Sequence, residues 1–307
     1  MNTHQNTAPH EMALFLEHRI PRDGQFLYAK EFPGQGPTFV MLHGFPDNHH
    51  IYDPLGQLLA NSGRHVVAFD FLGFGSSDKP QGYVYSYDQQ LADLDVVVDH
   101  LNLQQIVPVG HDSGGFVAIN YLLAHPERVA HLCLLNTFYT NTTTLRPPEL
   151  IQFFATSGVN AIAQKMAEDP AMLDFLLTFQ QSQFKAGGST TQQAVIDDLV
   201  RPIIQQNFAK TPSAAPAFVQ LVGGLFPQLG KNAASLARLK EMEIRCSIIW
   251  GNADAYLNVG VAKEFAATFR GASMHLLDAG HWVQLDLPEQ VGRFMLSEVN
   301  VQAVVSQ

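Results

Sequence analysis

The strongest constraint on the fold is a regular alternation of short apolar runs with amphipathic helical patterns. Apolar residues dominate six runs, at 38–44, 65–70, 106–110, 129–136, 244–251 and 273–280. Runs of this kind are typical of parallel strands that are buried on both faces. Helical patterns lie between them, as in 88–101, where Leu91, Leu94 and Val98 recur at steps of three and four. The alternation predicts an α/β fold with a mainly parallel, doubly wound sheet.

Two parts of the chain depart from this alternation. Residues 16–32 have the pattern of an antiparallel hairpin, which we place at the edge of the sheet. Residues 139–240 are helical in pattern, contain no clear strand and are divided by two glycine-rich breaks. We interpret this stretch as an inserted helical cap. The predicted domains are therefore a core of residues 11–138 and 241–302 and a cap of residues 139–240.

Composition and charge exclude several classes of function. The formal net charge of −10 disfavours a nucleic-acid partner or an anionic membrane surface. No apolar run approaches the roughly 20 residues that span a bilayer, and the polar first ten residues do not resemble a signal peptide. Cys133 and Cys246 lie in apolar runs, which indicates buried thiols and a cytoplasmic location. No metal-binding motif is present, and the sequence carries no signal for an oligomeric state.

Chemistry-bearing residues follow the predicted strands in a fixed order. HGFPDN (43–48) follows the first run, GHDSGG (110–115) the third, GNADAYL (251–257) the fifth and GH (280–281) the last. Active sites of open α/β sheets form at the carboxyl ends of the strands. The order nucleophile, acid, histidine is the order found in α/β hydrolases.

These motifs carry a family resemblance. Residues 15–300 resemble the α/β-hydrolase fold, and HGFP, DFLGFGSSDKP (70–80), GHDSGG and GHWVQLDLPEQV (280–291) are similar to its haloalkane dehalogenase and epoxide hydrolase branch. The resemblance implies a hydrolase that needs no cofactor and acts on a small molecule with water. It also implies a cis peptide bond before Pro46 and a structural role for His43.

The stretch GHDSGG contains two adjacent candidate nucleophiles, Asp112 and Ser113. The strand-to-helix turn that presents a nucleophile is sharp, so small residues are needed two positions before and after it. Around Asp112 these residues are Gly110 and Gly114, whereas the position two before Ser113 is His111. The glycine spacing therefore favours Asp112.

An aspartate nucleophile indicates attack on an sp³ carbon. Attack on an ester carbonyl would form a high-energy anhydride, whereas displacement at an sp³ carbon forms a stable alkyl ester. Water then hydrolyses this ester, with His281 as general base and Asp254 orienting the imidazole. Backbone N–H groups of Phe45 and Ser113 are the predicted oxyanion hole.

Other polar residues near these motifs receive simpler interpretations. Asp278 and Asp286 are too close to His281 along the chain to reach its far nitrogen. No acid follows the strand that ends at Asn136, which leaves Asp254 as the favoured third member. His49 and His50 are interpreted as exposed loop histidines.

The residues that assist the leaving group differ from the family pattern. Haloalkane dehalogenases have a tryptophan after the nucleophile, where this chain has Ser113, and often an asparagine after HG, where it has Phe45. Epoxide hydrolases use cap tyrosines, and only Tyr139, at the first edge of the cap, is near. We predict that Tyr139, Trp282 and Phe154 line the substrate pocket and that the substrate is neutral and mostly apolar.

Two alternatives remain open at this point. The chain is a carboxylesterase if Ser113 is the nucleophile. It is a non-catalytic ligand-binding protein if the missing leaving-group donors reflect a lost activity. The leading interpretation is a hydrolase that forms an aspartyl ester, either dehalogenase-like or epoxide hydrolase-like. Of the two we favour the dehalogenase-like reaction, because DFLGFGSSDKP and the residues around Asp112 are more similar to that group.

Overall fold

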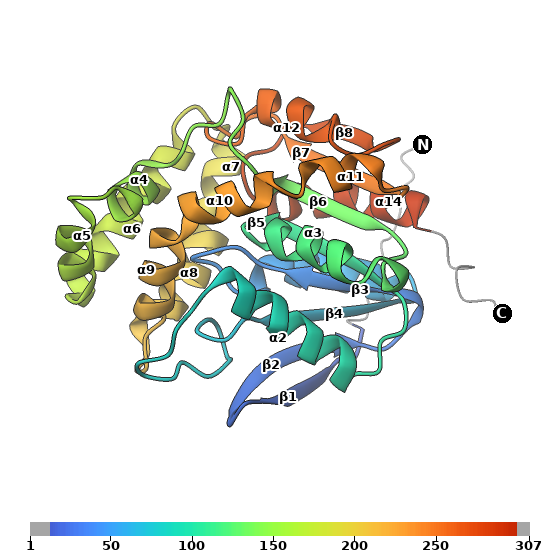
Figure 1. Ribbon diagram of the computed structural model, residues 1–307, viewed down its shortest axis with the longest axis horizontal. Helices are drawn as coiled ribbons and strands as arrows, with labels where there is room; N and C mark the ends of the chain where they lie inside the picture. Colours follow the sequence, from blue (N-terminus) through green and yellow to red (C-terminus); the bar gives the residue numbers. More distant parts are fainter. Residues whose placement is uncertain (1–12, 300–307) are drawn as a thin grey trace, which may run out of the picture.

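A computed structural model describes residues 13–299, and strands in this part of the chain form one eight-stranded sheet (Figure 1). The strand order is β1-β2-β4-β3-β5-β6-β7-β8, and every neighbouring pair from β4 to β8 is parallel. The predicted α/β fold with a mainly parallel sheet is confirmed. The strands are β1 (Leu16–Arg22), β2 (Gln25–Phe32), β3 (Gln35–Leu42), β4 (Arg64–Asp70), β5 (Ile106–Asp112), β6 (Leu132–Thr137), β7 (Cys246–Gly251) and β8 (Ser273–Leu277).

The first two strands form the predicted antiparallel hairpin at the sheet edge. Arg22 pairs with Gln25 across a two-residue turn in which Asp23 has φ +48° and Gly24 has φ +80°. An Asp-Gly pair with both φ values positive is favoured in two-residue hairpin turns. The hairpin continues the sheet because β2 pairs antiparallel with β4.

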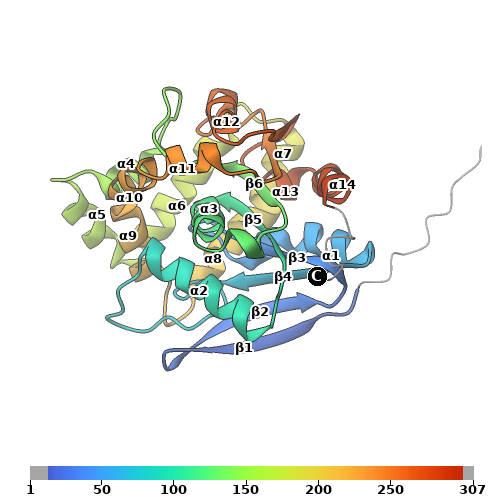
Figure 2. The same cartoon turned by 45° about the vertical axis from the view of Figure 1, so that its right-hand side comes forward.

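Helices cover both faces of the sheet (Figures 1 and 2). The helices α1 and α14 pack against each other on one face, and α2 and α3 pack together on the other. The core helices are α1 (Asp53–Asn61), α2 (Tyr87–His100), α3 (Gly114–Ala124), α12 (Val259–Ala266), α13 (Val283–Asp286) and α14 (Pro288–Glu298), with short turns η1 (His49–Tyr52) and η2 (Pro126–Arg128). The sequence pattern did not predict α1.

Only helices lie between β6 and β7 in the described chain. They are α4 (Glu149–Ala155), α5 (Asn160–Ala167), α6 (Pro170–Lys185), α7 (Thr190–Val195), η3 (Ile196–Val200), α8 (Arg201–Ala209), α9 (Ala215–Gly223), α10 (Leu225–Ala233) and α11 (Leu236–Glu241). We call residues 149–241 the helical segment. It begins within the predicted cap, residues 139–240, and ends one residue beyond it. The predicted core limits at residues 11 and 302, and the polar first ten residues, lie outside the described residues.

Hydrogen bonds tie the helical segment to loops at the carboxyl ends of the strands. Asn207 donates to the carbonyl oxygen of Pro46 at 2.6 Å, and the Tyr87 hydroxyl donates to the carbonyl oxygen of Leu221 at 3.0 Å. Asn232 donates to the carbonyl oxygen of Tyr139 at 2.9 Å. Figure 1 shows α8, α9 and α10 beyond this end of the sheet.

Both cysteines are free and buried, as predicted. Across residues 13–299 the longest apolar helices fall short of what is needed to cross a bilayer. The cytoplasmic location and the absence of a nucleic-acid partner stay predictions.

The turn from β5 to α3 is closely packed against its neighbours. A Cβ on Gly114 would overlap the backbone carbonyl of Leu42 at the end of β3, and a Cβ on Gly110 would overlap the backbone of Gly115. Glycine is required at these positions because backbone, which cannot rotate away, fills the space. Packing therefore accounts for the glycine spacing that singled out Asp112.

This packing predicts a loss of stability in Gly114→Ala. Overpacking against backbone costs about 1–3 kcal/mol, so the free energy of unfolding should fall by that amount in urea titrations. Gly230→Ala in α10 is the matched control, since nothing lies within 4 Å of its added Cβ. Alanine favours a helix by up to about 1 kcal/mol, so this control should be unchanged or more stable. Equal stability of Gly114→Ala and the wild type would contradict the close approach.

Candidate active site

The turn between β5 and α3 places Asp112 at the wall of an internal cavity. Asp112 ends β5 with φ +49°, a left-handed conformation that is uncommon outside glycine and marks a constrained turn. Ser113 is 1% exposed and is absent from the cavity wall. Its hydroxyl has no hydrogen-bond partner among residues 13–299. Of the two candidate nucleophiles, only Asp112 faces the cavity.

Two backbone N–H groups converge on the Asp112 carboxyl group. They belong to Phe45, in the loop after β3, and Ser113, at the start of α3. Both are the residues predicted to form the oxyanion hole, and the peptide bond between Phe45 and Pro46 is cis, as the family resemblance implied. Burial raises the pKa of Asp112, while His281 and the two N–H groups oppose that rise.

His281 and Asp254 form a hydrogen-bonded pair beside Asp112. The Nδ1 atom of His281 lies 2.7 Å from Oδ2 of Asp254. The side chain of Asn136 donates to the same oxygen at 3.0 Å, and backbone N–H groups of Tyr256 and Leu257 donate to Oδ1 at 2.9 and 3.0 Å. Asn136, at the strand end that lacks an acid, therefore helps to hold Asp254 in place.

The electrostatics of this pair favour a charged aspartate and a basic histidine. Burial alone would lower the pKa of His281, but the carboxyl groups of Asp254, Asp112 and Asp47 raise it above the usual value. Burial would raise the pKa of Asp254, but His281 and the N–H donors hold it below the usual value. Since Nδ1 of His281 faces Asp254, Nε2 is the nitrogen left for proton transfer.

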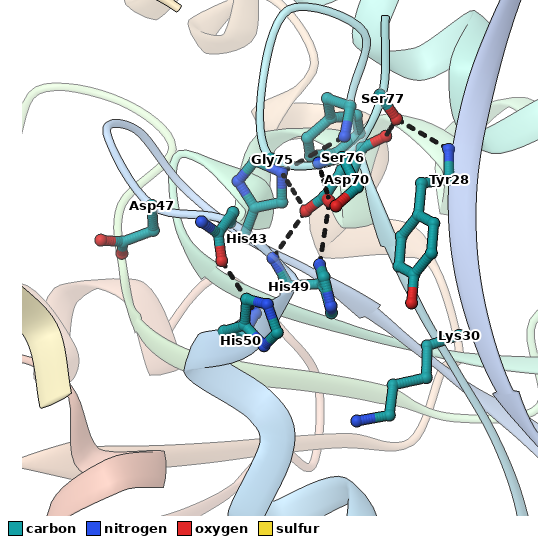
Figure 3. Close-up of polar contacts among 12 residues, drawn as sticks. Tyr28, Lys30, His43, Asp47, His49, His50, Asp70, Gly75, Ser76 and Ser77 are labelled. Carbon is teal, nitrogen blue, oxygen red and sulfur yellow. Dashed lines mark hydrogen bonds and ion pairs between the residues drawn. The ribbon is translucent and has the colours of Figure 1, made fainter. Parts of the chain in front are cut away.

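A buried aspartate fixes the loop that carries Phe45. Asp70, at the end of β4, accepts the backbone N–H of His49 at 2.7 Å, its Nδ1 at 2.9 Å and the N–H of Ser76 at 2.7 Å (Figure 3). The expectation that His49 is exposed is wrong: it is 2% exposed, because its ring pairs with this buried carboxylate. His43 accepts the N–H of Phe71 at 3.2 Å, which agrees with a structural role.

The cavity has a volume of about 870 Å³, part of it open to solvent, and a mostly apolar wall. Side chains of α4, α6, α9 and α10 contribute to it, together with loops of the core. Apolar members of the wall include Phe138, Leu150, Leu177, Phe184, Phe218 and Leu229. A mostly apolar wall with few polar groups fits a small, largely apolar molecule.

The three predicted pocket residues have different positions. Trp282 lines the cavity, whereas Tyr139 and Phe154 are not part of its wall. The Tyr139 hydroxyl donates to Oδ1 of Asn120 on α3 at 2.7 Å, and the Phe154 ring packs on Phe218, with ring centres 5.4 Å apart. Packing inside the protein accounts for both side chains.

Four polar residues of the cavity wall were missed from the sequence: Asp47, Gln180, Gln181 and Tyr256. The Tyr256 hydroxyl donates to Glu149 and accepts from Gln180 Nε2 at 2.9 Å. Asp47 accepts from the indole N–H of Trp282 at 3.0 Å. Asp47 lies inside the HGFPDN motif, and this position could have indicated that it is near the site. Its hydrogen bond with Trp282 joins residues 235 positions apart, so the sequence did not predict it.

Among residues 13–299, one trio has ligand atoms close enough to hold a metal ion: His49, His50 and Asp53. These side chains already have partners. Asp53 is paired with His50 at 2.6 Å and with the ammonium of Lys30 at 2.8 Å, and His49 is paired with Asp70. The positive charge of Lys30 opposes a cation there, and we assign no metal to it.

Three relatives are similar to this chain over different lengths. A cis-3-alkyl-4-alkyloxetan-2-one decarboxylase of Shewanella oneidensis is 38% identical over 127 residues, which cover 40% of this chain and 39% of that protein. Haloalkane dehalogenase 2 of Mycobacterium tuberculosis is 26% identical, over 87% of this chain and 89% of the relative. Epoxide hydrolase 3 of Xenopus tropicalis is 25% identical, over 88% and 73%.

The family assignment rests on most of the chain. The family model for the alpha/beta hydrolase fold matches residues 37–288. This range includes the Phe45 loop, Asp112, Asp254 and His281, together with the helical segment. The chain belongs to the α/β-hydrolase fold family, in the branch that includes haloalkane dehalogenases and epoxide hydrolases.

Proposed function

We propose that the protein hydrolyses a neutral, mostly apolar small molecule through a covalent ester on Asp112. The observation that carries this proposal is the position of Asp112. Its carboxyl group lines the apolar cavity with His281 and accepts the N–H groups of Phe45 and Ser113. The hydroxyl of Ser113, the alternative nucleophile, belongs to a residue that is buried behind the wall.

The reaction has two steps. An Asp112 oxygen attacks an sp³ carbon of the substrate, the bond to the leaving group breaks, and the leaving group takes the electron pair. Water then attacks the carbonyl carbon of the new ester while Nε2 of His281 accepts a proton from it. The N–H groups of Phe45 and Ser113 stabilise the oxyanion, and Asp254 stabilises the imidazolium. As the intermediate collapses, the bond to the ester oxygen breaks and this oxygen takes the remaining proton of the water, which releases an alcohol and regenerates the Asp112 carboxylate.

The helical segment has the role of a cap in this proposal. Its side chains form much of the apolar wall around Asp112 and limit the access of bulk water, which strengthens electrostatic interactions inside. The names of the three relatives refer to haloalkanes, epoxides and alkyloxetanones. These compounds share an sp³ carbon bonded to a leaving halogen or ring oxygen, which is the electrophile that an aspartate nucleophile requires.

His281→Gln should trap the intermediate. The first step does not need the imidazole, whereas hydrolysis of the ester does, so a covalent adduct should accumulate. Intact-mass spectrometry after incubation with panels of alkyl halides and epoxides measures it. The double variant Asp112→Asn/His281→Gln is the control and should stay unmodified. The absence of an adduct with every compound would favour the non-catalytic alternative.

Separate substitutions of Asp112 and Ser113 distinguish an aspartate nucleophile from a serine nucleophile. Asp112→Asn should lower kcat by about 10⁴-fold or more, as expected for loss of a nucleophile. Ser113→Ala keeps the backbone N–H and should change kcat by less than about threefold, because it removes a hydroxyl outside the cavity wall. Steady-state rates with halides, epoxides and activated esters provide the measurement. Ester turnover that survives Asp112→Asn but not Ser113→Ala would establish a serine esterase.

The pH dependence of ester hydrolysis should report His281. The imidazole must be neutral to accept a proton, and nearby carboxyl groups raise its pKa above 6.5. Decay of the covalent intermediate should therefore slow as the pH falls through that raised pKa, with a midpoint above 6.5. Single-turnover kinetics from pH 5 to pH 9 measure the midpoint, and a midpoint well below 6.5 would contradict the role of the carboxyl groups.

A further inference from the structure

Asp47 is a second carboxyl group in the cavity, and the mechanism above does not use it. It lies in the loop after β3, two residues beyond Phe45, and is 2% exposed. It lines the same cavity as Asp112 and His281. Figure 3 shows its side chain pointing away from the Asp70 network that anchors the loop.

The two oxygens of Asp47 differ in their surroundings. Oδ2 accepts the indole N–H of Trp282 at 3.0 Å. Oδ1 is buried and has no hydrogen-bond partner among residues 13–299. A buried carboxylate oxygen without a donor is costly, whereas a protonated oxygen can itself donate to a group in the cavity.

His111 adds a second reason for a protonated Asp47. Its Nε2 lies 2.9 Å from the carbonyl oxygen of His281. A carbonyl oxygen can only accept a hydrogen bond, so Nε2 carries the hydrogen. In the neutral ring Nδ1 is therefore unprotonated. That Nδ1 is unpartnered and lies 3.9 Å from Oδ2 of Asp47. Burial holds the pKa of His111 well below its usual value, so the ring supplies no positive charge to a carboxylate.

The charged and titratable groups around Asp47 come from β5, η1 and the loop after β8: His111, Asp112, Tyr52 and His281. Burial raises the pKa of Asp47 to about 7, the Asp112 charge adds to the rise, and Trp282 and His281 oppose it. A substantial fraction of Asp47 is therefore neutral near pH 7.

We propose that Asp47 is the proton donor to the leaving group, and that the substrate is a neutral molecule whose leaving atom is a ring oxygen, such as an epoxide. The inference rests on the proposed function of Asp112. As Asp112 attacks the sp³ carbon, the C–O bond breaks and its electron pair goes to the oxygen. The carboxyl proton of Asp47 moves to that oxygen and leaves a carboxylate that accepts from Trp282. The proton that His281 takes from water in the second step restores the acid.

The chemistry of the cavity favours oxygen over halide. An alkoxide is strongly basic and needs a proton, whereas a halide ion needs only hydrogen-bond donors. The Trp282 N–H is occupied by Asp47, and the Tyr256 hydroxyl donates to Glu149. Once Asp47 ionises, its charge repels a halide ion inside an apolar cavity.

The test isolates the first step in a His281→Gln background. Styrene oxide and 1-bromo-2-phenylethane are the probes, and intact-mass spectrometry follows the rate of adduct formation. Adding Asp47→Asn keeps an oxygen for the Trp282 N–H and removes the transferable proton. It should slow the adduct with the epoxide by about 100-fold, within the range of general acid catalysis, and change the bromide rate by less than about threefold.

Controls separate this inference from the proposed function. Asp278→Asn, at an exposed position, should leave both rates unchanged. Equal slowing of both probes by Asp47→Asn would indicate a packing role and overturn the inference, as would no slowing of the epoxide. Adducts that fail to form with either probe while Asp47 is intact would overturn the proposed function and, with it, this inference.

A second measurement covers an Asp47→Asn protein that does not fold. With Asp47 intact in the His281→Gln background, the epoxide rate should fall as the pH rises above about 7, because the acid loses its proton there and the loss of His281 removes a group that lowers its pKa. The bromide rate should show no such fall. An epoxide rate that stays constant or increases across this range would overturn the inference.

Discussion

Close approach of two loops is the constraint on which the site depends. The loop after β3 and the turn after β5 touch so tightly that a Cβ on Gly44 would overlap the Asp112 side chain. A Cβ on Gly114 would overlap the backbone of Leu42. This contact brings the N–H of Phe45 and that of Ser113 to the same carboxyl group, although they are 68 residues apart. An oxyanion hole built from backbone has fixed dipoles, so little reorganisation is needed when charge develops.

The contact holds only because the far end of the same loop is also fixed. Burial alone would raise the pKa of Asp70, but the His49 ring, whose own pKa is raised beside this carboxylate, and the His49 backbone N–H hold the pKa of Asp70 far below its usual value. Burial of an ion pair is unfavourable unless its hydrogen bonds are satisfied, and here Ser76 provides a further N–H. Phe45 and Asp47 therefore lie between two rigid attachments.

The spacing of residues along the sequence predicted those parts of the structure that are determined by neighbouring residues. The strands, the edge hairpin and the glycines around Asp112 follow from apolar runs and from the sharpness of one turn. His281 and Asp254 followed from their order after strands, because parallel strands end at one edge of a sheet. The hydrogen bond between Asn136 and Asp254 was not predictable in this way, since nothing in the sequence around an asparagine indicates a partner 118 residues away.

The burial and orientation of polar side chains were not predicted from the sequence. His49 lies in a polar loop and was expected to be exposed, yet it pairs with a carboxylate inside the core. Tyr139 was expected at the pocket, but its hydroxyl turns to Asn120 on α3. The acidity of Asp47 depends on Trp282 and His111, which come from distant strands and loops. Whether a side chain faces the core or the cavity is a tertiary property, so single-residue patterns do not predict it.

The two carboxyl groups of the cavity differ because their hydrogen-bond donors differ. Burial raises the pKa of Asp112, but two backbone N–H groups and His281 oppose that rise and so favour its charged form. Asp47 receives one indole N–H and faces the bare nitrogen of His111, so its neutral form is favoured. A base and an acid of the same residue type can thus coexist in one cavity near neutral pH, separated by environment alone. In the proposed mechanism, Asp112 determines the type of intermediate, and Asp47 determines which leaving group the cavity can accept.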